Sequence, residues 1–232
     1  NAMIVDSSAL AEQVVADAVV SAFDSAGQRC SALRVLCLQE DIADRVLEML
    51  EGAMAELSVG NPERLAVDVG PVIDDDARAM LVRYIDGMRA RGHRVHQVSV
   101  DAAADKTSNR GTFVPPTLIS IDRIEQLERE VFGPVLHVLR YRREELDRLV
   151  DGINALGYGL TLGVHSRVDG KSDRVVRRAH AGNIYVNRNI VGAVVGVQPF
   201  GGEGLSGTGP KAGGPLYLYR LLSKYPSDAA LA

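Results

Sequence analysis

The sequence has few of the residues that build disulfide or metal frameworks. It contains two cysteines and no tryptophan in 232 residues. Two cysteines are too few for a disulfide framework, and without CxxC spacing and further ligands they make a poor zinc site. We therefore expect neither a disulfide nor a metal site.

Long apolar runs and clustered positive charge are also lacking. No run approaches the roughly 20 apolar residues of a membrane-spanning helix, and no basic segment followed by an apolar stretch marks a secretory signal. The net charge of −4 argues against a nucleic-acid partner, which would require a basic face. These absences favour a cytoplasmic protein that binds small molecules.

The composition is that of a folded domain. Hydrophobic residues make up 46% and charged residues 24% of the chain, which excludes a disordered or collagen-like protein. The length is ample for a packed core. No internal repeat and no linker divides the chain, so residues 1–232 are interpreted as one unit.

Hydrophobic periodicity and turn residues predict alternating helices and strands. Helices are expected at 8–27 (with Ser7 and Ser8 as N-caps), 40–57, 75–91, 122–131, 143–155 and 170–180. Strands are expected at 32–38, 94–100, 113–121, 135–141, 160–165 and 183–187. The alternation in the second half predicts an α/β fold, with a largely parallel sheet and flanking helices.

Several loops interrupt these elements. Residues 101–112 are polar and indicate a loop. Pro115 and Pro116 confine the following extended segment to an edge or to the end of a strand. Residues 192–214 hold nine glycines, which we interpret as a series of loops lining a surface.

Cys30 lies where a predicted helix ends and a strand begins, in Gly27-Gln-Arg-Cys-Ser31. A thiol at such a junction can reach a cleft, and backbone N–H groups and Arg29 could lower its pKa. A lone cysteine beside an arginine leaves a nucleophile and a structural thiol both open. Cys37, inside an apolar run, is expected in the core. Seven positions along a strand would place the two thiols on opposite faces.

Two further motifs are ambiguous when taken singly. Glu130 precedes Phe-Gly-Pro, which is typical of a helix that ends before a strand. Residues 198–209 are glycine-rich but lack the spacing of a nucleotide-binding loop, so their glycines are expected to allow tight turns and close approach to a ligand.

In combination and in this order, the motifs resemble the catalytic half of the aldehyde dehydrogenase superfamily. The matching segments are 27–30, 60–72, 111–117, 130–135, 154–161, 182–187 and 199–202. The chain most resembles the Δ1-pyrroline-5-carboxylate dehydrogenases, and within that group residues 187–202 favour the C-terminal modules of bifunctional bacterial proline-utilisation flavoproteins.

This resemblance implies a reaction and its catalytic and substrate-binding residues. Cys30 matches the nucleophile, which attacks the aldehyde of glutamate γ-semialdehyde to give a thiohemiacetal. Hydride transfer to NAD and hydrolysis of the resulting thioester then yield glutamate. Ser31 and the backbone amides of Gly192 and Ala193 match the group that holds the substrate carboxylate. Phe200 matches an aromatic residue that packs on the aliphatic part of the substrate.

The resemblance also implies a cofactor site. Glu130 matches the carboxylate that binds the nicotinamide ribose, and Phe132 and Leu160 match nicotinamide contacts, with plain core packing still open for these two. NAD would be bound mainly by an upstream domain. A flavin, FAD, would belong only to a preceding proline dehydrogenase domain.

The sequence also departs from the family pattern. The upstream Rossmann-type domain, the general-base glutamate and the oxyanion-binding amide are missing, so we expect an inactive fragment of a catalytic domain and of a homo-oligomer. Asn1 and Ala2 are either native or added ahead of Met3, and residues 215–232 are expected to be an oligomerisation segment or tail. Two alternatives stay open. One is an NAD(P)-dependent dehydrogenase for another aldehyde, and the other is a non-catalytic oligomerisation domain.

Overall fold

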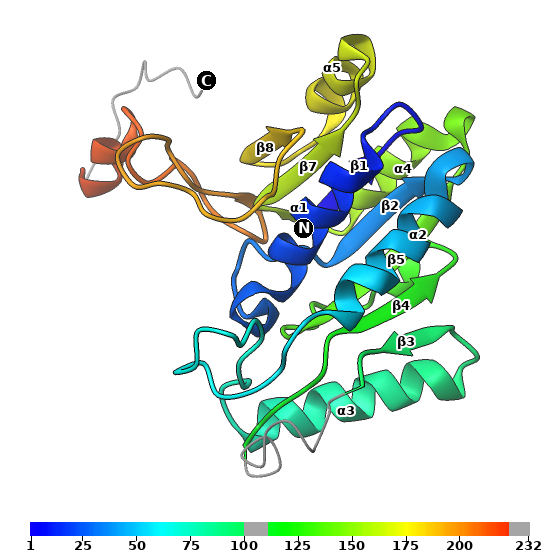
Figure 1. Cartoon of the computed structure of the whole chain (residues 1–232). Coiled ribbons are helices and arrows are strands. Elements are labelled where there is room, and N and C mark those ends of the chain that lie inside the picture. The colour runs from blue at the N-terminus through cyan, green and yellow to red at the C-terminus, as the bar shows by residue number, and fades with distance from the viewer. Residues whose placement is uncertain (100–110, 223–232) are drawn as a thin grey trace.

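Seven strands form one sheet, in the order β3-β4-β5-β2-β1-β7-β8 (Figure 1). The structure, a computed structural model, describes residues 1–99 and 111–222. The strands are β1 (Ala2–Val5), β2 (Val35–Gln39), β3 (Val95–Gln97), β4 (Thr117–Ile121), β5 (Val135–Tyr141), β7 (Thr161–His165) and β8 (Asn183–Val186). Every neighbouring pair is parallel except β3 and β4. The predicted α/β fold with a largely parallel sheet is confirmed.

Helices lie on both faces of this sheet (Figure 1). They are α1 (Ala11–Phe23), α2 (Glu40–Ala55), α3 (Asp75–Ala90), α4 (Leu146–Ala155) and α5 (Asp169–Arg178). Helices α1 and α2 lie together on one face, α4 and α5 belong to the opposite face, and α3 lies beside β3. None of these helices within the described residues has the length and apolar character needed to cross a membrane.

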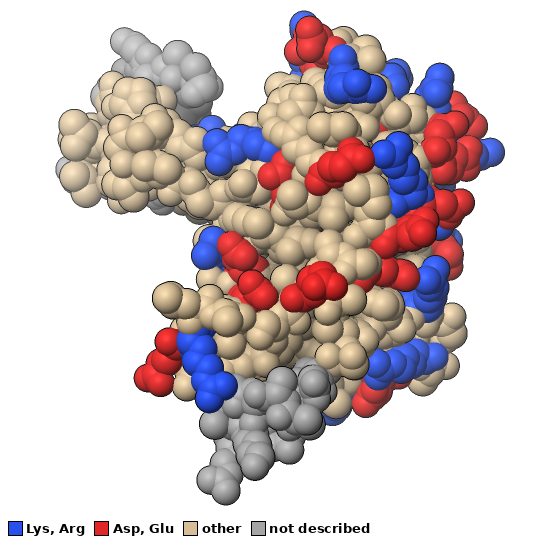
Figure 2. Space-filling view, viewed as in Figure 1, with Lys and Arg blue, Asp and Glu red and all other residues tan. Residues whose placement is uncertain are grey.

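The chain after β8 projects away from the sheet as loops (Figure 1). It contains β9 (Glu203–Gly204), which pairs with β6 (Tyr158–Gly159), and the short 3-10 helix η5 (Tyr217–Leu221). Figure 2 shows that this projection carries few charged side chains, whereas the visible face of the rest of the molecule carries many acidic and basic ones. Its exposed apolar side chains include those of Val194, Val195, Val197, Leu205, Leu218 and Leu221.

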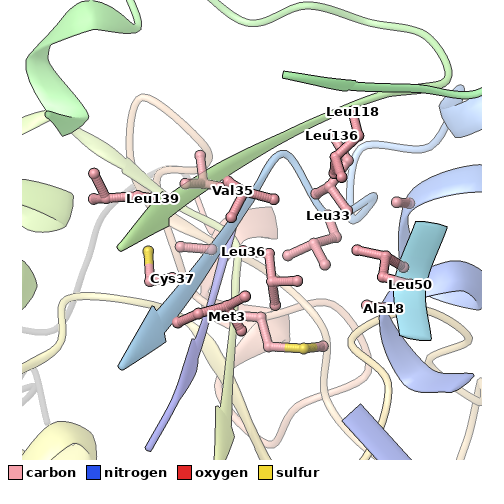
Figure 3. Packing of buried hydrophobic residues seen from close by; sticks show 14 of the residues in the cluster. Met3, Ala18, Leu33, Val35, Leu36, Cys37, Leu50, Leu118, Leu136 and Leu139 are labelled. Atoms are coloured by element: carbon pink, nitrogen blue, oxygen red, sulfur yellow. The ribbon is translucent and has the colours of Figure 1, made fainter. Parts of the chain in front are cut away.

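The core follows from the alternation of side chains along buried strands. Met3 and Leu36, which are partners in the β1–β2 register, lie near Leu50 of α2 and Ala18 of α1 (Figure 3). Cys37 points away from this group and is fully buried, so its predicted core role is confirmed. Both cysteines are free thiols.

The central strand β1 was not predicted. It lies between β2 and β7, and its four residues are buried. Four apolar residues show no alternation by which a strand could be recognised, and the sequence alone does not show whether Asn1 and Ala2 are native or added. Both are part of the fold, because Ala2 begins the strand and Asn1 bonds to the segment before β2.

Other expectations need correction at their boundaries. The predicted strand 32–38 runs instead over Val35–Gln39, so Cys30 lies in a turn and the two thiols are not placed on opposite faces of one strand. Ser7 and Ser8 do not cap α1, whose N-cap is Leu10 without a side-chain bond. Ser8 instead donates to the Asp6 carboxylate through its N–H and its hydroxyl, at 2.6 and 2.5 Å.

The predicted helix 122–131 is wrong. Only the 3-10 helix η3 (Ile124–Gln126) forms there. The Gln126 side-chain oxygen accepts from the N–H groups of Asp122 and Arg123, at 2.8 and 3.0 Å, which closes this turn on itself.

The remaining expectations concern β3, β4 and the loop between them. The predicted strand 94–100 is shorter, as β3, and Val100 and residues 101–110 lie outside the described residues. Strand β4 begins directly after Pro116 and lies inside the sheet, so the prolines mark a strand end and not an edge.

Candidate functional site

Cys30 lies in a tight turn between the 3-10 helix η1 (Asp24–Gly27) and β2. Ser25, Ala26 and Gly27 all have positive φ, which reverses the chain ahead of the cysteine. A Cβ atom on Gly27 would lie 2.2 Å from the carbonyl oxygen of Gly133. Glycine is therefore required at position 27, both by its conformation and by the close approach of the segment before β5.

The carbonyl groups of the cysteine turn are fixed by Asn1, just before β1, and by Thr161, at the start of β7. The Asn1 carboxamide donates to the carbonyls of Cys30 and Ala32, at 2.7 and 2.9 Å. The Thr161 hydroxyl donates to the carbonyl of Ser31 at 3.3 Å. Three consecutive carbonyls are thus anchored, while the side chain of Cys30 remains exposed.

Arg34 joins the cysteine turn to the segment before β5. Its Nη1 donates to the carbonyls of Gly27 and Gly133, at 2.7 and 3.2 Å, and its Nη2 donates to the carbonyl of Arg29 at 3.3 Å. Its Nε donates to Oε1 of Glu130 at 3.1 Å. Sequence reasoning missed this residue, although an arginine within an apolar run was itself a signal, because a buried guanidinium needs partners.

The charge of Arg34 is buried, and its aromatic neighbour is not. Arg34 is 6% exposed, and its guanidinium carbon lies 4.9 Å from the ring centroid of Phe132. Burial lowers the pKa of Arg34, and the Glu130 carboxylate opposes that effect. An arginine remains protonated in this setting. Phe132 is 41% exposed.

One cavity brings Cys30 and Glu130 together. It has a volume of about 340 Å³ and lies at the amino ends of β1, β2 and β7. Its apolar wall includes Ile124, Leu127, Val150, Ile153 and Leu156. The Glu130 side chain is 38% exposed. The cavity therefore combines an accessible thiol, an accessible carboxylate and an apolar wall. Within residues 1–99 and 111–222, no cluster of three His, Cys, Asp or Glu residues is suited to hold a metal ion.

The other predicted site residues lie apart from this cavity. Leu160 and Phe200 line a second cavity of about 240 Å³ among the glycine-rich loops. Ser31 is buried beside Cys30. In the part of the chain that the structure describes, Gly192 and Ala193 line neither cavity. The roles of these residues stay predictions.

A buried histidine supports the backbone of Arg34. His137 Nδ1 lies 3.0 Å from the carbonyl oxygen of Arg34, and its Nε2 lies 2.8 Å from the Tyr84 hydroxyl. A carbonyl only accepts, so Nδ1 carries the proton and Nε2 accepts from Tyr84. Burial lowers the pKa of His137 to about 4, so the ring is neutral at pH 7.

Comparison with known proteins gives a consistent family assignment. The family model described as "Aldehyde dehydrogenase family" matches residues 1–223 of this chain. Bifunctional protein PutA from Klebsiella aerogenes is 66% identical over 230 residues, which are 99% of this chain and 18% of that protein. The chain therefore spans less than a fifth of this curated relative.

Solved structures agree with this assignment. A crystal structure of bifunctional proline utilization A (PutA) matches with a TM-score of 0.88 and 55% identity, over 94% of this chain and 21% of that one. A 1-pyrroline-5-carboxylate dehydrogenase from Thermus, solved with bound NAD, matches with a TM-score of 0.78 and 34% identity. That match covers 89% of this chain and 39% of that one.

Proposed function

The chain belongs to the aldehyde dehydrogenase family, and we propose that it supplies the thiol half of an NAD-dependent active site in proline catabolism. The substrate is glutamate γ-semialdehyde, the open form of pyrroline-5-carboxylate, and the product is glutamate. One observation carries this proposal: the exposed thiol of Cys30 and the carboxylate of Glu130 share a cavity. The names of the similar proteins, PutA and 1-pyrroline-5-carboxylate dehydrogenase, favour this substrate over other aldehydes.

Cys30 carries the covalent step. Its thiolate Sγ forms a bond to the aldehyde carbon, and the carbonyl electron pair moves to oxygen, giving a thiohemiacetal. The backbone N–H of Cys30 donates to the oxyanion, in a turn whose carbonyls are anchored by Asn1 and Thr161. When held at Glu130 and Phe132, NAD would supply the hydride acceptor, and the oxidised carbon would remain on Cys30 as a thioester. Water then adds to the thioester, the Cys30 thiolate departs, and glutamate is released with a proton.

Glu130 fits the cofactor's ribose. Arg34 bonds to Oε1 of the carboxylate, and the side chain remains partly exposed at the cavity. An ionised carboxylate only accepts hydrogen bonds, so it is suited to a pair of hydroxyl donors. Phe132 is exposed close by and offers a flat apolar face to the nicotinamide. We assign the rest of NAD binding, the general base and any flavin to other parts of the full-length protein.

The substrate carboxylate is assigned to Ser31 and to the backbone amides of Gly192 and Ala193. Gly192 has a φ of +77°, a conformation that favours glycine and can turn successive N–H groups toward one anion. Phe200 is held by two backbone hydrogen bonds with Ala212, both 3.0 Å. We assign Phe200 to packing on the aliphatic part of the substrate. Leu160, which lines the same cavity, is assigned to contact with the nicotinamide.

Substrate selectivity of the full-length protein tests the proposed function. NADH formation from pyrroline-5-carboxylate is expected to proceed with a kcat/KM at least about 100-fold above that for acetaldehyde, which lacks the carboxylate. The Ser31→Ala variant should raise the KM for pyrroline-5-carboxylate and leave acetaldehyde oxidation unchanged. Equal efficiency with both aldehydes would contradict the substrate assignment. The 232-residue chain alone should show no turnover.

The projecting loops favour a further assignment, contact between copies of the full-length protein. Exposed apolar side chains gather there, whereas an isolated one such as Leu65 needs no explanation. The Leu218→Glu variant of the full-length protein should dissociate in sedimentation velocity, and Leu65→Glu is the matched control. An unchanged assembly in Leu218→Glu would exclude this contact.

A further inference from the structure

We propose that Arg34 is a positioning residue that presets Glu130 for the cofactor and holds it in register with the Cys30 turn. This inference rests on the proposed role of Glu130 in binding NAD. Arg34 directly precedes β2 and lies four residues after Cys30. Its guanidinium donates hydrogen bonds to the segment before β5. It therefore connects the two parts of the chain that form the cavity.

The hydrogen bonds of Arg34 divide between these two parts. The carbonyls of Gly27 and Arg29, on the side of the thiol, accept at 2.7 and 3.3 Å. The carbonyl of Gly133 and Oε1 of Glu130, on the side of the cofactor, accept at 3.2 and 3.1 Å. A planar guanidinium offers five donors in a fixed fork, so one side chain can satisfy four acceptors in different directions.

The contact with Glu130 joins a buried group to an accessible one. Arg34 is almost completely buried, while the Glu130 side chain is 38% exposed at the cavity. The bond at Oε1 fixes the carboxylate while its outer side stays accessible. A carboxylate that is already oriented loses less conformational freedom when a ligand binds.

Phe132 completes the arrangement. Its ring lies over the Arg34 guanidinium, at 4.9 Å from centroid to carbon. The same buried cation thus restrains both of the half-exposed side chains assigned to the cofactor. Three carbonyl acceptors alone would account for a purely structural arginine, whereas the contacts with Glu130 and Phe132 link Arg34 to the binding site.

A double-mutant cycle in the full-length protein tests this role. Glu130→Gln is expected to raise the KM for NAD about tenfold, and Arg34→Lys should raise it by a similar factor, because an ammonium cannot reach all four acceptors. The double variant should be no worse than the poorer single variant. The KM for pyrroline-5-carboxylate should stay within about twofold throughout. Arg45→Lys, in an exposed pair with Glu12, is the matched control.

The outcomes separate this inference from the proposed function. An unchanged KM for NAD in Glu130→Gln would refute the cofactor role of Glu130. A raised KM in Glu130→Gln with an unchanged KM in Arg34→Lys, or with effects that multiply in the double variant, would refute the role of Arg34 alone.

A second variant covers the case in which Arg34→Lys does not fold. Glu130→Asp keeps the charge but withdraws it from Arg34 by one methylene, at a position whose side chain is partly exposed. It should raise the KM for NAD without changing the melting temperature. A wild-type KM in Glu130→Asp, beside a raised KM in Glu130→Gln, would overturn the inference.

Discussion

The two ends of the parallel sheet contrast sharply. At the amino ends, a cavity of about 340 Å³ exposes Cys30 and Glu130. At the carboxyl ends of β1, β5 and β7, the corresponding space is about 10 Å³ and is lined by residues such as Asp6 and Lys171. Open parallel sheets commonly bind ligands at their carboxyl ends. In this protein the cavity with the accessible thiol and carboxylate lies at the opposite, amino end.

The carboxyl end is closed because its polar groups bind one another. The Asp6 carboxylate accepts from the N–H and hydroxyl of Ser8 and from the Ser166 hydroxyl at 2.6 Å, and Lys171 lies 3.2 Å away. At the amino end, by contrast, the Cys30 thiol and part of the Glu130 carboxylate face the cavity. Charged side chains near strand ends therefore mark a site only where some of their hydrogen-bonding groups remain accessible.

The largest expected effect separates the two cysteines. Cys30→Ala should lower NADH formation by the full-length protein at least about 10³-fold, because the substitution removes the proposed nucleophile. Cys37→Ala is the matched control, in which turnover per folded molecule is retained and stability falls by about 1 kcal/mol. Activity retained in Cys30→Ala, or lost in Cys37→Ala with the fold intact, would reverse the assignment.

Acidification should reveal the buried histidine near the amino end. The folded pKa of His137 is about 4, below the ordinary 6.5, so the unfolded chain binds the extra proton between these values. The free energy of unfolding should therefore fall by about 3 kcal/mol as the pH falls from 7 to 4. Urea unfolding of the 232-residue chain measures this.

Two variants test which histidine causes this pH-dependent loss of stability. His137→Asn should remove most of the pH dependence of the free energy of unfolding. His165, at the carboxyl end, has a pKa that is lowered by burial and in part restored by Asp17, so it acts in the same direction. If His165→Asn, and not His137→Asn, abolished the dependence, the histidine near the cysteine turn would not be its source.

A smaller loss of stability is expected when the hydrogen-bond network around Asp6, at the carboxyl end of the sheet, is broken. Asp6→Ala should destabilise the chain by about 2 kcal/mol, because the buried hydroxyl of Ser166 loses its closest acceptor and Ser8 loses the carboxylate to which it donates. Burial raises the pKa of Asp6, but hydrogen bonds from Ser166 and Ser8 outweigh it and lower the pKa below its ordinary value. Its contribution is present above that ordinary value and is lost as the pH falls through the folded one.

Kinetics provide the control for Asp6. Kinetic constants of the folded full-length protein should match those of the wild type, measured at a temperature where both are folded. A specific loss of NAD binding in Asp6→Ala would mean that the carboxyl end also takes part in the site.

The alternation of helices and strands could be predicted from local patterns, whereas strand β1 could not, and Cys30 is singled out as a nucleophile only by its resemblance to a family motif. Cys37 lies in an apolar run and is buried, and Cys30 and Glu130 lie in motifs that share a cavity. Arg34 could not be placed, because its acceptors Glu130 and Gly133 are 96 and 99 residues away in sequence. The helix expected at 122–131 does not form: the Gln126 side chain closes a single 3-10 turn, and Glu130 lies outside any helix, where it pairs with Arg34.

Stoichiometric alkylation of the full-length protein with iodoacetamide tests whether Cys30 is the nucleophile. Peptide mass spectrometry would follow Cys30 and Cys37 while NADH formation is measured. Burial raises the pKa of the Cys37 thiol to about 12, which keeps it unreactive in the folded protein. We predict that activity falls in direct proportion to modification of Cys30, with Cys37 unmodified. Full activity with Cys30 completely alkylated would mean that Cys30 is not the nucleophile.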